Sequence, residues 1–351
     1  MTNLVKLPGL IDPHVHLREP GATQKEDFET GTKAAISGGY TTVLDMPNNP
    51  IATVSPEALQ EKINLASNKI YCDVGFHFGA SGKSVQYFQE VAPKVFGLKV
   101  YMNQTTGDLL MEDDQTLEAV FSGWPKEKPL LAHAEGDTLQ KAISLAKQFG
   151  NRLHVCHVSL KEEVKMIKQA KTEGLNISCE VSCHHLFLTE EDVERLGSFG
   201  MMKPPLSSKA DQEALWEALV DGTIDMIGSD HAPHTKEEKL GEKPAYGVPG
   251  LETTLPLLLT AVNDGRLTIE RLIELTSTNP RKVFGIPEQP ETYVEVDMEE
   301  NWIIDDKNLQ TKCGWTPFVG MKVKGKVKKV VLRGEVVFDG QNVIGPFGQV
   351  L

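Results

Sequence analysis

The chain alternates strand-like and helix-like segments eight times, and this pattern constrains the fold more than any other feature. Short apolar or β-branched runs lie at 7–17, 41–47, 73–80, 97–102, 129–134, 152–158, 176–182 and 224–229. Amphipathic stretches typical of helices begin near residues 25, 55, 85, 113, 137, 161, 209 and 253. Eight such units in roughly 280 residues favour an α/β fold, a (β/α)8 barrel of the TIM type. A doubly wound open sheet is the rival fold. It predicts a GxGxxG motif after the first strand, and none follows it in the sequence.

The sequence changes character after the last of these units. Residues 322–337 alternate and are rich in β-formers, and the turn signal DGQ follows them. We expect this part to form a small β appendage together with the first residues of the chain. The predicted domains are a barrel at 8–290 and a small β-rich subdomain at 1–7 plus 291–351.

Composition limits the partners that the chain can have. Lys and Arg number 36 against 49 Asp and Glu, so the formal net charge is −13. Nucleic acid and anionic membranes both need a positive face, and neither is an expected partner. No apolar run reaches the ~18 residues of a membrane-spanning helix, and no signal peptide is apparent. The five cysteines form no CxxC pair, which indicates a reducing compartment and predicts a cytoplasmic protein.

Residues able to do chemistry gather where the predicted strands end, which is where barrel enzymes carry catalytic side chains. They include His14, His16, Asn48, Lys99, His133, Cys156, His157, Glu180 and Asp230. The two-residue spacing of His14 and His16 puts both on one face of a strand, where both could ligate one metal. Taken alone, that pair fits a polar loop entrance equally well, and His133 fits a satisfied core histidine better. Four histidines and one aspartate at the same rim together favour a metal site.

Lys99 is unusual because it lies in the apolar strand GLKVYM, where an unpaired ammonium group is costly. Its side chain could reach solvent from the strand end, or it could form a Schiff base with a substrate. A third possibility is a carbamate formed with carbon dioxide, which would bridge two cations as a carboxylate does. Position alone leaves all three open, and the surrounding histidines favour the carbamate. His184 and His185, near the same rim, are expected to be structural.

Several longer motifs carry a resemblance to a known family. They are PGLIDPHVHLREPG (8–21), DMPN (45–48), GLKVY (97–101), HAE (133–135), SDHAPHT (229–235), PGLETTLPLLLTAV (249–262) and NPRKVFG (279–285). The chain resembles the dihydroorotase family of the amidohydrolase superfamily, and most closely the dihydroorotase domain of the animal multifunctional pyrimidine-synthesis protein. In that protein the domain lies between carbamoyl-phosphate synthetase and aspartate transcarbamoylase. We therefore expect a homodimer that is fused to or associated with those two activities.

The resemblance implies a set of metal ligands. His14, His16, Lys99 and Asp230 match the ligands of one zinc ion, and Lys99, His133 and His157 match those of a second. Lys99 would be N6-carboxylated and would bridge the two ions together with a hydroxide. Cys156, Glu180 and His14 match the ligands of a possible third zinc ion.

The resemblance also implies a substrate site. Arg18 and Asn48 match residues that bind the substrate carboxylate, and His234 matches a further substrate contact. Thr105 matches the catalytic-loop threonine that closes over the substrate. Two positions depart from the animal pattern, because Thr106 replaces a phenylalanine and Lys203 stands where an arginine is expected. Tyr246 lies where the family uses a backbone contact.

The implied function is that of a zinc-dependent dihydroorotase, which reversibly cyclises N-carbamoyl-L-aspartate to L-dihydroorotate plus water in de novo pyrimidine biosynthesis. Asp230 would act as general base and then as general acid. Another cyclic amidase, such as dihydropyrimidinase, is one alternative, but Arg18 and Asn48 disfavour it because its substrates lack the ring carboxylate. An inactive dihydroorotase-like scaffold is the other, and such homologues lose metal ligands that are all present in this sequence.

Overall fold

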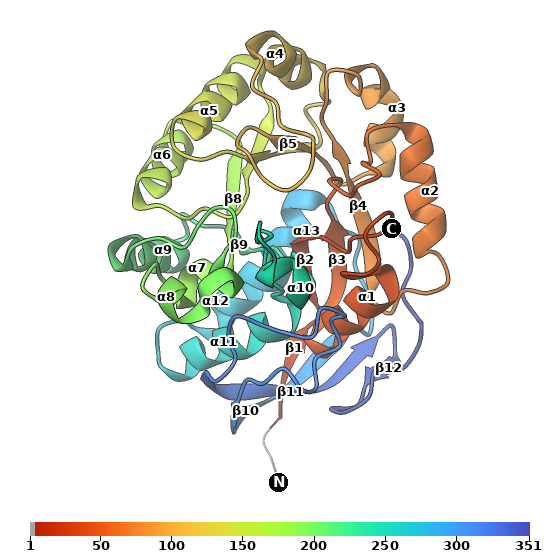
Figure 1. The fold of residues 1–351 in the computed structure, drawn as a ribbon, viewed down its shortest axis with the longest axis vertical. Helices are drawn as coiled ribbons and strands as arrows, with labels where there is room; N and C mark the ends of the chain where they lie inside the picture. Colours follow the sequence, from red (N-terminus) through yellow and green to blue (C-terminus); the bar gives the residue numbers. More distant parts are fainter. Residues whose placement is uncertain (1–3) are drawn as a thin grey trace.

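A computed structural model of the chain describes residues 4–351. Its larger part is an eight-stranded parallel sheet in the order β2-β3-β4-β5-β6-β7-β8-β9. The strands are β2 Leu10–Val15, β3 Tyr40–Asp45, β4 Asp73–Gly79, β5 Gly97–Tyr101, β6 Pro129–His133, β7 Arg152–Val155, β8 Ile177–Val181 and β9 Met226–Ile227. The sheet curls into a nearly closed barrel, and the predicted fold class is confirmed (Figure 1).

The last strand returns to the first at the carboxyl end of the barrel. His231 forms a parallel bridge with Val15, and the N–H of His16 donates to the carbonyl oxygen of His231 at 2.8 Å. Almost all residues of the eight strands are buried, as expected for parallel strands covered on both faces.

Helices surround the barrel, because the chain crosses over its outside between successive strands (Figure 1). They are α1 Phe28–Ser37, α2 Pro56–Ala66, α3 Phe88–Val91, α4 Asp114–Gly123, α5 Asp137–Phe149, α6 Lys161–Thr172, α7 Cys183–Phe187, α8 Asp192–Leu196, α9 Lys209–Asp221, α10 Lys236–Leu240, α11 Leu251–Asn263, α12 Ile269–Ile273 and α13 Asn279–Phe284. Helix α5 illustrates why they form: Leu139, Ala142 and Ala146 recur on one buried face, and Gly150 ends the helix at a φ of 72°.

A second, antiparallel sheet is built from both ends of the described chain. Its order is β1-β10-β11-β12. The strands are β1 Leu4–Pro8, β10 Tyr293–Ile303, β11 Lys322–Leu332 and β12 Glu335–Phe338. The expectation of a β appendage is confirmed. The domain boundaries at 8–290 and at 1–7 plus 291–351 stay a proposal.

The expectation of one continuous strand at 7–17 is wrong, because the chain breaks at Gly9. Residues before Gly9 pair with β10, and residues after it enter the barrel. A Cβ atom at Gly9 would lie 2.3 Å from Oγ1 of Thr41. Only glycine allows the backbone to pass from one sheet to the other this close to β3.

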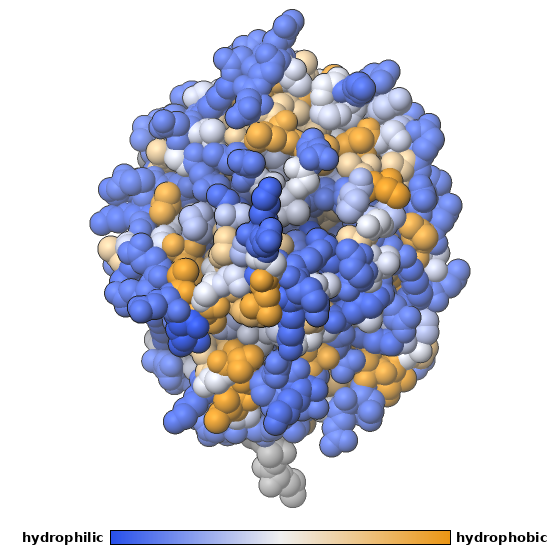
Figure 2. Space-filling view, in the orientation of Figure 1, coloured by the Kyte–Doolittle hydropathy of each residue, from blue (hydrophilic) through white to orange (hydrophobic). Residues whose placement is uncertain are grey.

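Hydrophilic side chains cover most of the face seen in Figure 2, with hydrophobic ones in small scattered groups. Within residues 4–351, no helix combines the length and the apolar character that crossing a membrane requires.

Candidate metal and substrate site

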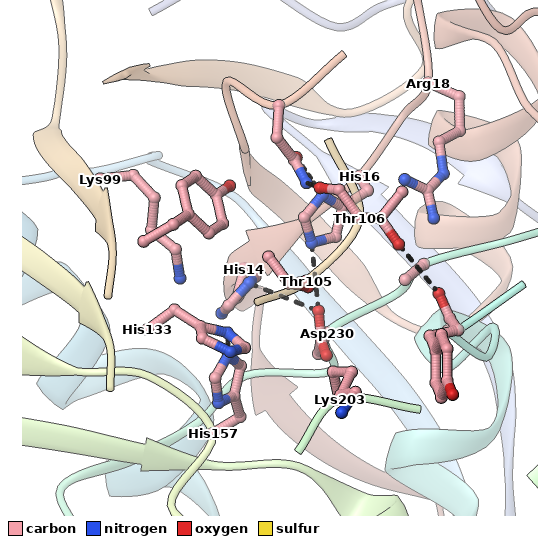
Figure 3. A pocket seen from close by; sticks show the side chains of 15 residues that line it. His14, His16, Arg18, Lys99, Thr105, Thr106, His133, His157, Lys203 and Asp230 are labelled. Atoms are coloured by element: carbon pink, nitrogen blue, oxygen red, sulfur yellow. Dashed lines mark hydrogen bonds and ion pairs between the residues drawn. The ribbon is translucent and has the colours of Figure 1, made fainter. Parts of the chain in front are cut away.

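The carboxyl ends of the barrel strands surround one pocket, and most of the predicted site residues line it (Figure 3). The predicted residues that line it are His14, His16, Arg18, Asn48, Lys99, Thr105, His133, His157, Lys203, Asp230 and Tyr246. Cys156, Glu180 and His234 do not line it, and all three are buried behind its wall.

One group of possible metal ligands joins the first and last strands of the barrel. His14 lies in β2, His16 follows it, and Asp230 comes after β9. A single oxygen of Asp230 lies 3.1 Å from Nε2 of His16 and 3.4 Å from Nε2 of His14. One ligand atom from each residue lies within 4.8 Å of the others, so one cation could contact all three.

A second group shares His14 and lies deeper. Nδ1 of His14 contacts Oε1 of Glu180, and the ligand atoms of His14, Cys156 and Glu180 again lie within 4.8 Å of one another. Nζ of Lys99 donates to Sγ of Cys156 at 2.9 Å, which places the lysine amine beside this group. The other oxygen of Glu180 lies 3.1 Å from Nε2 of His154. His14 therefore links two candidate metal sites through its two ring nitrogens.

His133 and His157 form a third pair of ligand nitrogens on the same rim. Nδ1 of His133 lies 2.9 Å from Nε2 of His157, and both rings are buried. Within residues 4–351, Nδ1 of His157 has no hydrogen-bond partner. Buried ring nitrogens without partners are rare in folded proteins, and binding a metal ion is one way to satisfy them.

The electrostatics of the pocket favour a cation near His14. Burial lowers the pKa of His14, but Glu180 and Asp230 outweigh it and raise this pKa to about 10. Burial lowers the pKa of His16 to about 3, so its ring stays neutral and able to act as a ligand. Burial raises the pKa of the Asp230 carboxyl, but His14 and His16 outweigh it and hold this pKa below its usual range. Two ionised carboxylates thus surround one imidazole.

Three residues at this site have backbone conformations that favour glycine. The φ angles are 63° at Arg18, 33° at His157 and 47° at Asp230. A non-glycine residue in this region costs of order 1–3 kcal/mol and is maintained only when the surrounding structure imposes it. These angles turn the three side chains, each just after a strand, toward the pocket or its wall.

Arg18 is a buried cation without an anion. Its side chain is 5% exposed and lines the pocket. Nε donates to the carbonyl oxygen of Pro233 at 3.0 Å, and Nη2 lies 3.2 Å from Nε2 of His234. No carboxylate of residues 4–351 comes within ion-pair distance of this guanidinium group. His234 lies behind Arg18 and contacts Arg18 directly.

The loop after β5 crosses the mouth of the pocket. Nδ2 of Asn48 donates to the carbonyl oxygen of Thr106 at 2.9 Å, while Oγ1 of Thr106 lies 3.4 Å from the carbonyl oxygen of Tyr246. Thr106 therefore joins the loop to both sides of the pocket. Thr105 faces the pocket beside it, as Figure 3 shows.

Two residues of the site escaped the sequence analysis. The carboxylate of Asp12 accepts hydrogen bonds from the N–H groups of His14 and Ser229, each at 3.1 Å, and so fixes two strand ends that carry ligands. Tyr101 lines the pocket, and Nζ of Lys99 lies 5.1 Å from the centre of its ring. The sequence could have indicated both residues. Asp12 lies two positions from His14 and Tyr101 lies two positions from Lys99, and residues two apart share one side of a strand.

The sequence of the chain is similar to those of known proteins. The model of the amidohydrolase family matches residues 5–337. The chain is 38% identical to a dihydroorotase of Methanosphaera stadtmanae, over 96% of this chain and 86% of that protein. It is 48% identical to the multifunctional protein CAD of Squalus acanthias, where the match covers 99% of this chain but only 16% of that protein.

Solved structures of related proteins share the fold of this chain. The L-hydantoinase (dihydropyrimidinase) of Arthrobacter aurescens superposes with a TM-score of 0.94 at 28% identity, over 99% of this chain and 88% of that one. The inactive dihydroorotase-like domain of the Chaetomium thermophilum CAD-like multifunctional protein superposes with a TM-score of 0.85 at 28% identity, over 99% of both chains. The chain therefore belongs to the amidohydrolase family and, within it, to the dihydroorotases.

Proposed function

We propose that this chain catalyses the reversible cyclisation of N-carbamoyl-L-aspartate to L-dihydroorotate and water, a step of de novo pyrimidine biosynthesis. The observation that carries the proposal is the buried Arg18 guanidinium, which faces the same pocket as His14, His16 and Asp230. The free carboxylate of dihydroorotate supplies the anion that Arg18 lacks, and its ring amide is the bond to be hydrolysed.

The donor set of the pocket fits two zinc ions. His14, His16, Asp230 and Lys99 would hold one ion, and Lys99 with His133 and His157 would hold the other. Lys99 would carry an N6-carboxylate, because a neutral amine cannot bridge two cations. His14, Cys156 and Glu180 supply the nitrogen, sulfur and oxygen donors that a third zinc ion accepts. When bound, the zinc ions would polarise the amide carbonyl and lower the pKa of water toward about 7.

The residues of the chain divide the remaining work. Arg18 and Asn48 bind the free carboxylate by hydrogen bonds, and Lys203 adds a positive charge at the same pocket. In hydrolysis, Asp230 accepts the proton of the attacking water and passes it to the ring nitrogen as the carbon–nitrogen bond breaks. In cyclisation, Asp230 takes the proton of the ureido nitrogen. Thr105, on the loop across the mouth, contacts the substrate and helps to exclude bulk water.

The family resemblance supports further proposals about context. The chain spans about a sixth of the multifunctional relatives, 16% of those from Squalus acanthias and Dictyostelium discoideum. We propose that it works in the cytoplasm as a homodimer, fused to or associated with carbamoyl-phosphate synthetase and aspartate transcarbamoylase.

Two rival functions predict different behaviour. An inactive scaffold would need no metal ligands, whereas this chain brings His14, His16 and Asp230 together. A dihydropyrimidinase acts on uncharged rings, and such a substrate would leave the buried Arg18 without an anion. Neither rival accounts for both features.

One experiment separates the three functions. Zinc content and hydrolysis are measured on the same preparation, with L-dihydroorotate and with 5,6-dihydrouracil, which lacks the carboxylate. A dihydroorotase should hold about two zinc ions or more per chain and should hydrolyse dihydroorotate far faster. Faster hydrolysis of dihydrouracil would indicate the dihydropyrimidinase, and zinc-poor protein without turnover would indicate the scaffold.

A further inference from the structure

Lys239 on α10 is a fully buried lysine, 0% exposed, and none of the roles assigned above involves it. Its Nζ donates to the carbonyl oxygens of Met201 at 2.9 Å, Ala245 at 2.8 Å and Gly247 at 3.1 Å. An ammonium group has three N–H donors, so backbone carbonyls use all of them. No carboxylate of the described chain lies within ion-pair distance of Nζ, which is 5.5 Å from the centre of the Trp315 ring.

The three carbonyls belong to two segments that form one wall of the substrate pocket. Met201 lies two residues before Lys203, and Ala245 and Gly247 flank Tyr246. Lys203, Tyr246 and Gly247 all line the pocket. The segments also contact each other, because the N–H of Gly247 donates to the carbonyl oxygen of Met201 at 3.0 Å. Nζ of Lys203 lies 5.2 Å from the centre of the Tyr246 ring. Lys239 thus holds this wall together from behind.

A charge at this position is expensive for the fold. Burial lowers the pKa of Lys239 to about 8, and no anion offsets the loss of hydration. A methionine would pack against Trp315 at lower cost, but it would leave the carbonyl oxygens of Ala245 and Gly247 without a donor and Met201 with only the N–H of Gly247. We therefore infer that the lysine serves to hold these two segments in position.

We propose that Lys239 is a positioning residue for recognition of the substrate carboxylate, acting through the segments 201–203 and 245–247. It sets the place of Lys203 and of the Tyr246 backbone in the pocket that Arg18 also lines, and it touches neither the substrate nor the metal ligands. The inference rests on the proposed function, since it concerns the same pocket and the same ligand.

The test compares Lys239→Met and Lys239→Gln with a control on the same helix, Lys236→Met. Lys236 is exposed, and its one ion pair within residues 4–351 is with Asp306, at 3.5 Å. We expect Lys239→Met to raise KM for L-dihydroorotate about tenfold or more while kcat changes by less than about threefold and zinc content is unchanged. Lys239→Gln keeps part of the donor capacity and should give an intermediate KM, and Lys236→Met should match the parent protein.

The outcomes are distinct. A parent protein without dihydroorotate hydrolysis overturns the proposed function. An active parent protein whose folded Lys239 variants keep the parent KM overturns this inference alone, and so does a parallel fall of kcat and zinc content in the folded variants. If Lys239→Met does not fold, the Lys239→Gln variant decides, because an increase in KM without loss of kcat supports the inference and an unchanged KM refutes it.

Discussion

Replacing Arg18 by methionine removes a buried guanidinium group that faces the pocket and has no carboxylate partner among residues 4–351. Methionine has a similar length and is flexible, so it fills the same space without a charge. In the structure, two groups of the guanidinium contact the protein, Nε with Pro233 and Nη2 with His234. The remaining N–H groups are free to bind a ligand.

The expected magnitude follows from these contacts. A guanidinium group has five N–H donors; the hydrogen bond to Pro233 uses one of them, and the contact with His234 occupies no more than one other. The rest include donors on both terminal nitrogens, the fork that binds a carboxylate through two hydrogen bonds. Each such bond to a charged group contributes about 1.5–3 kcal/mol, so the loss of both removes about 3–6 kcal/mol. The value of kcat/KM for dihydroorotate should fall about 10²- to 10⁴-fold.

The assay measures kcat/KM for L-dihydroorotate and for 5,6-dihydrouracil with the parent protein, Arg18→Met and a surface control. Arg195→Met serves as control, because the ion pair that Arg195 forms in the described chain is an exposed one with Asp192. The loss should be confined to the substrate that carries the carboxylate. Equal losses for both substrates, or a loss below about tenfold for dihydroorotate, would refute the assignment of Arg18 to the carboxylate.

Three further variants test the other assigned roles. Asp230→Asn should fold normally and lose more than about tenfold in kcat in both directions, because an amide cannot accept the proton; a smaller loss would contradict proton transfer by Asp230. Lys99→Ala should lose metal and most activity, and short carboxylic acids or bicarbonate should restore part of it; a variant that keeps two metals and ignores these additives would exclude the carbamate. Thr105→Ala should lower kcat/KM at least about tenfold in both directions without loss of zinc, and unchanged kinetics would reduce the loop to a connection.

The barrel was predictable because each strand is short, apolar and followed by an amphipathic helix. That pattern locates strands along the chain, but it does not show where one sheet ends and another begins. The break at Gly9 depends on the distance to Thr41, which lies in another strand. The pairing of Val350 with Val74, which brings the end of the chain against β4, is equally invisible in the sequence.

The rim residues were predictable because parallel strands bring their carboxyl ends to one edge. Strand position alone does not distinguish a side chain that lines the pocket from one behind its wall, and Glu180 and His234 lie behind it. In the sequence, Thr106 stands out only as a departure from the family pattern. In the structure, it joins the loop to Asn48 and to Tyr246. Contacts between loops depend on the folded geometry, and short-range patterns do not record them.

All ten histidines are in or near the barrel, and sequence alone could not separate ligands from core residues. His77 is a core residue: it is fully buried, and its Nε2 lies 3.0 Å from the carbonyl oxygen of Pro13. Burial lowers its pKa from 6.5 to about 3. As the pH falls below the unfolded value, the unfolded chain binds a proton that the folded chain refuses, so the free energy of unfolding decreases.

The variant His77→Gln keeps a donor for Pro13 and removes the titration. Between about pH 7 and about pH 4.5, the parent protein should lose about 2.5 kcal/mol more unfolding free energy than the variant. Urea unfolding at the two pH values measures this, and any packing cost of glutamine cancels because it is the same at both. A parent and a variant that lose stability in parallel would show that the pKa of His77 is the same in the folded and the unfolded chain, as expected if water reaches the ring.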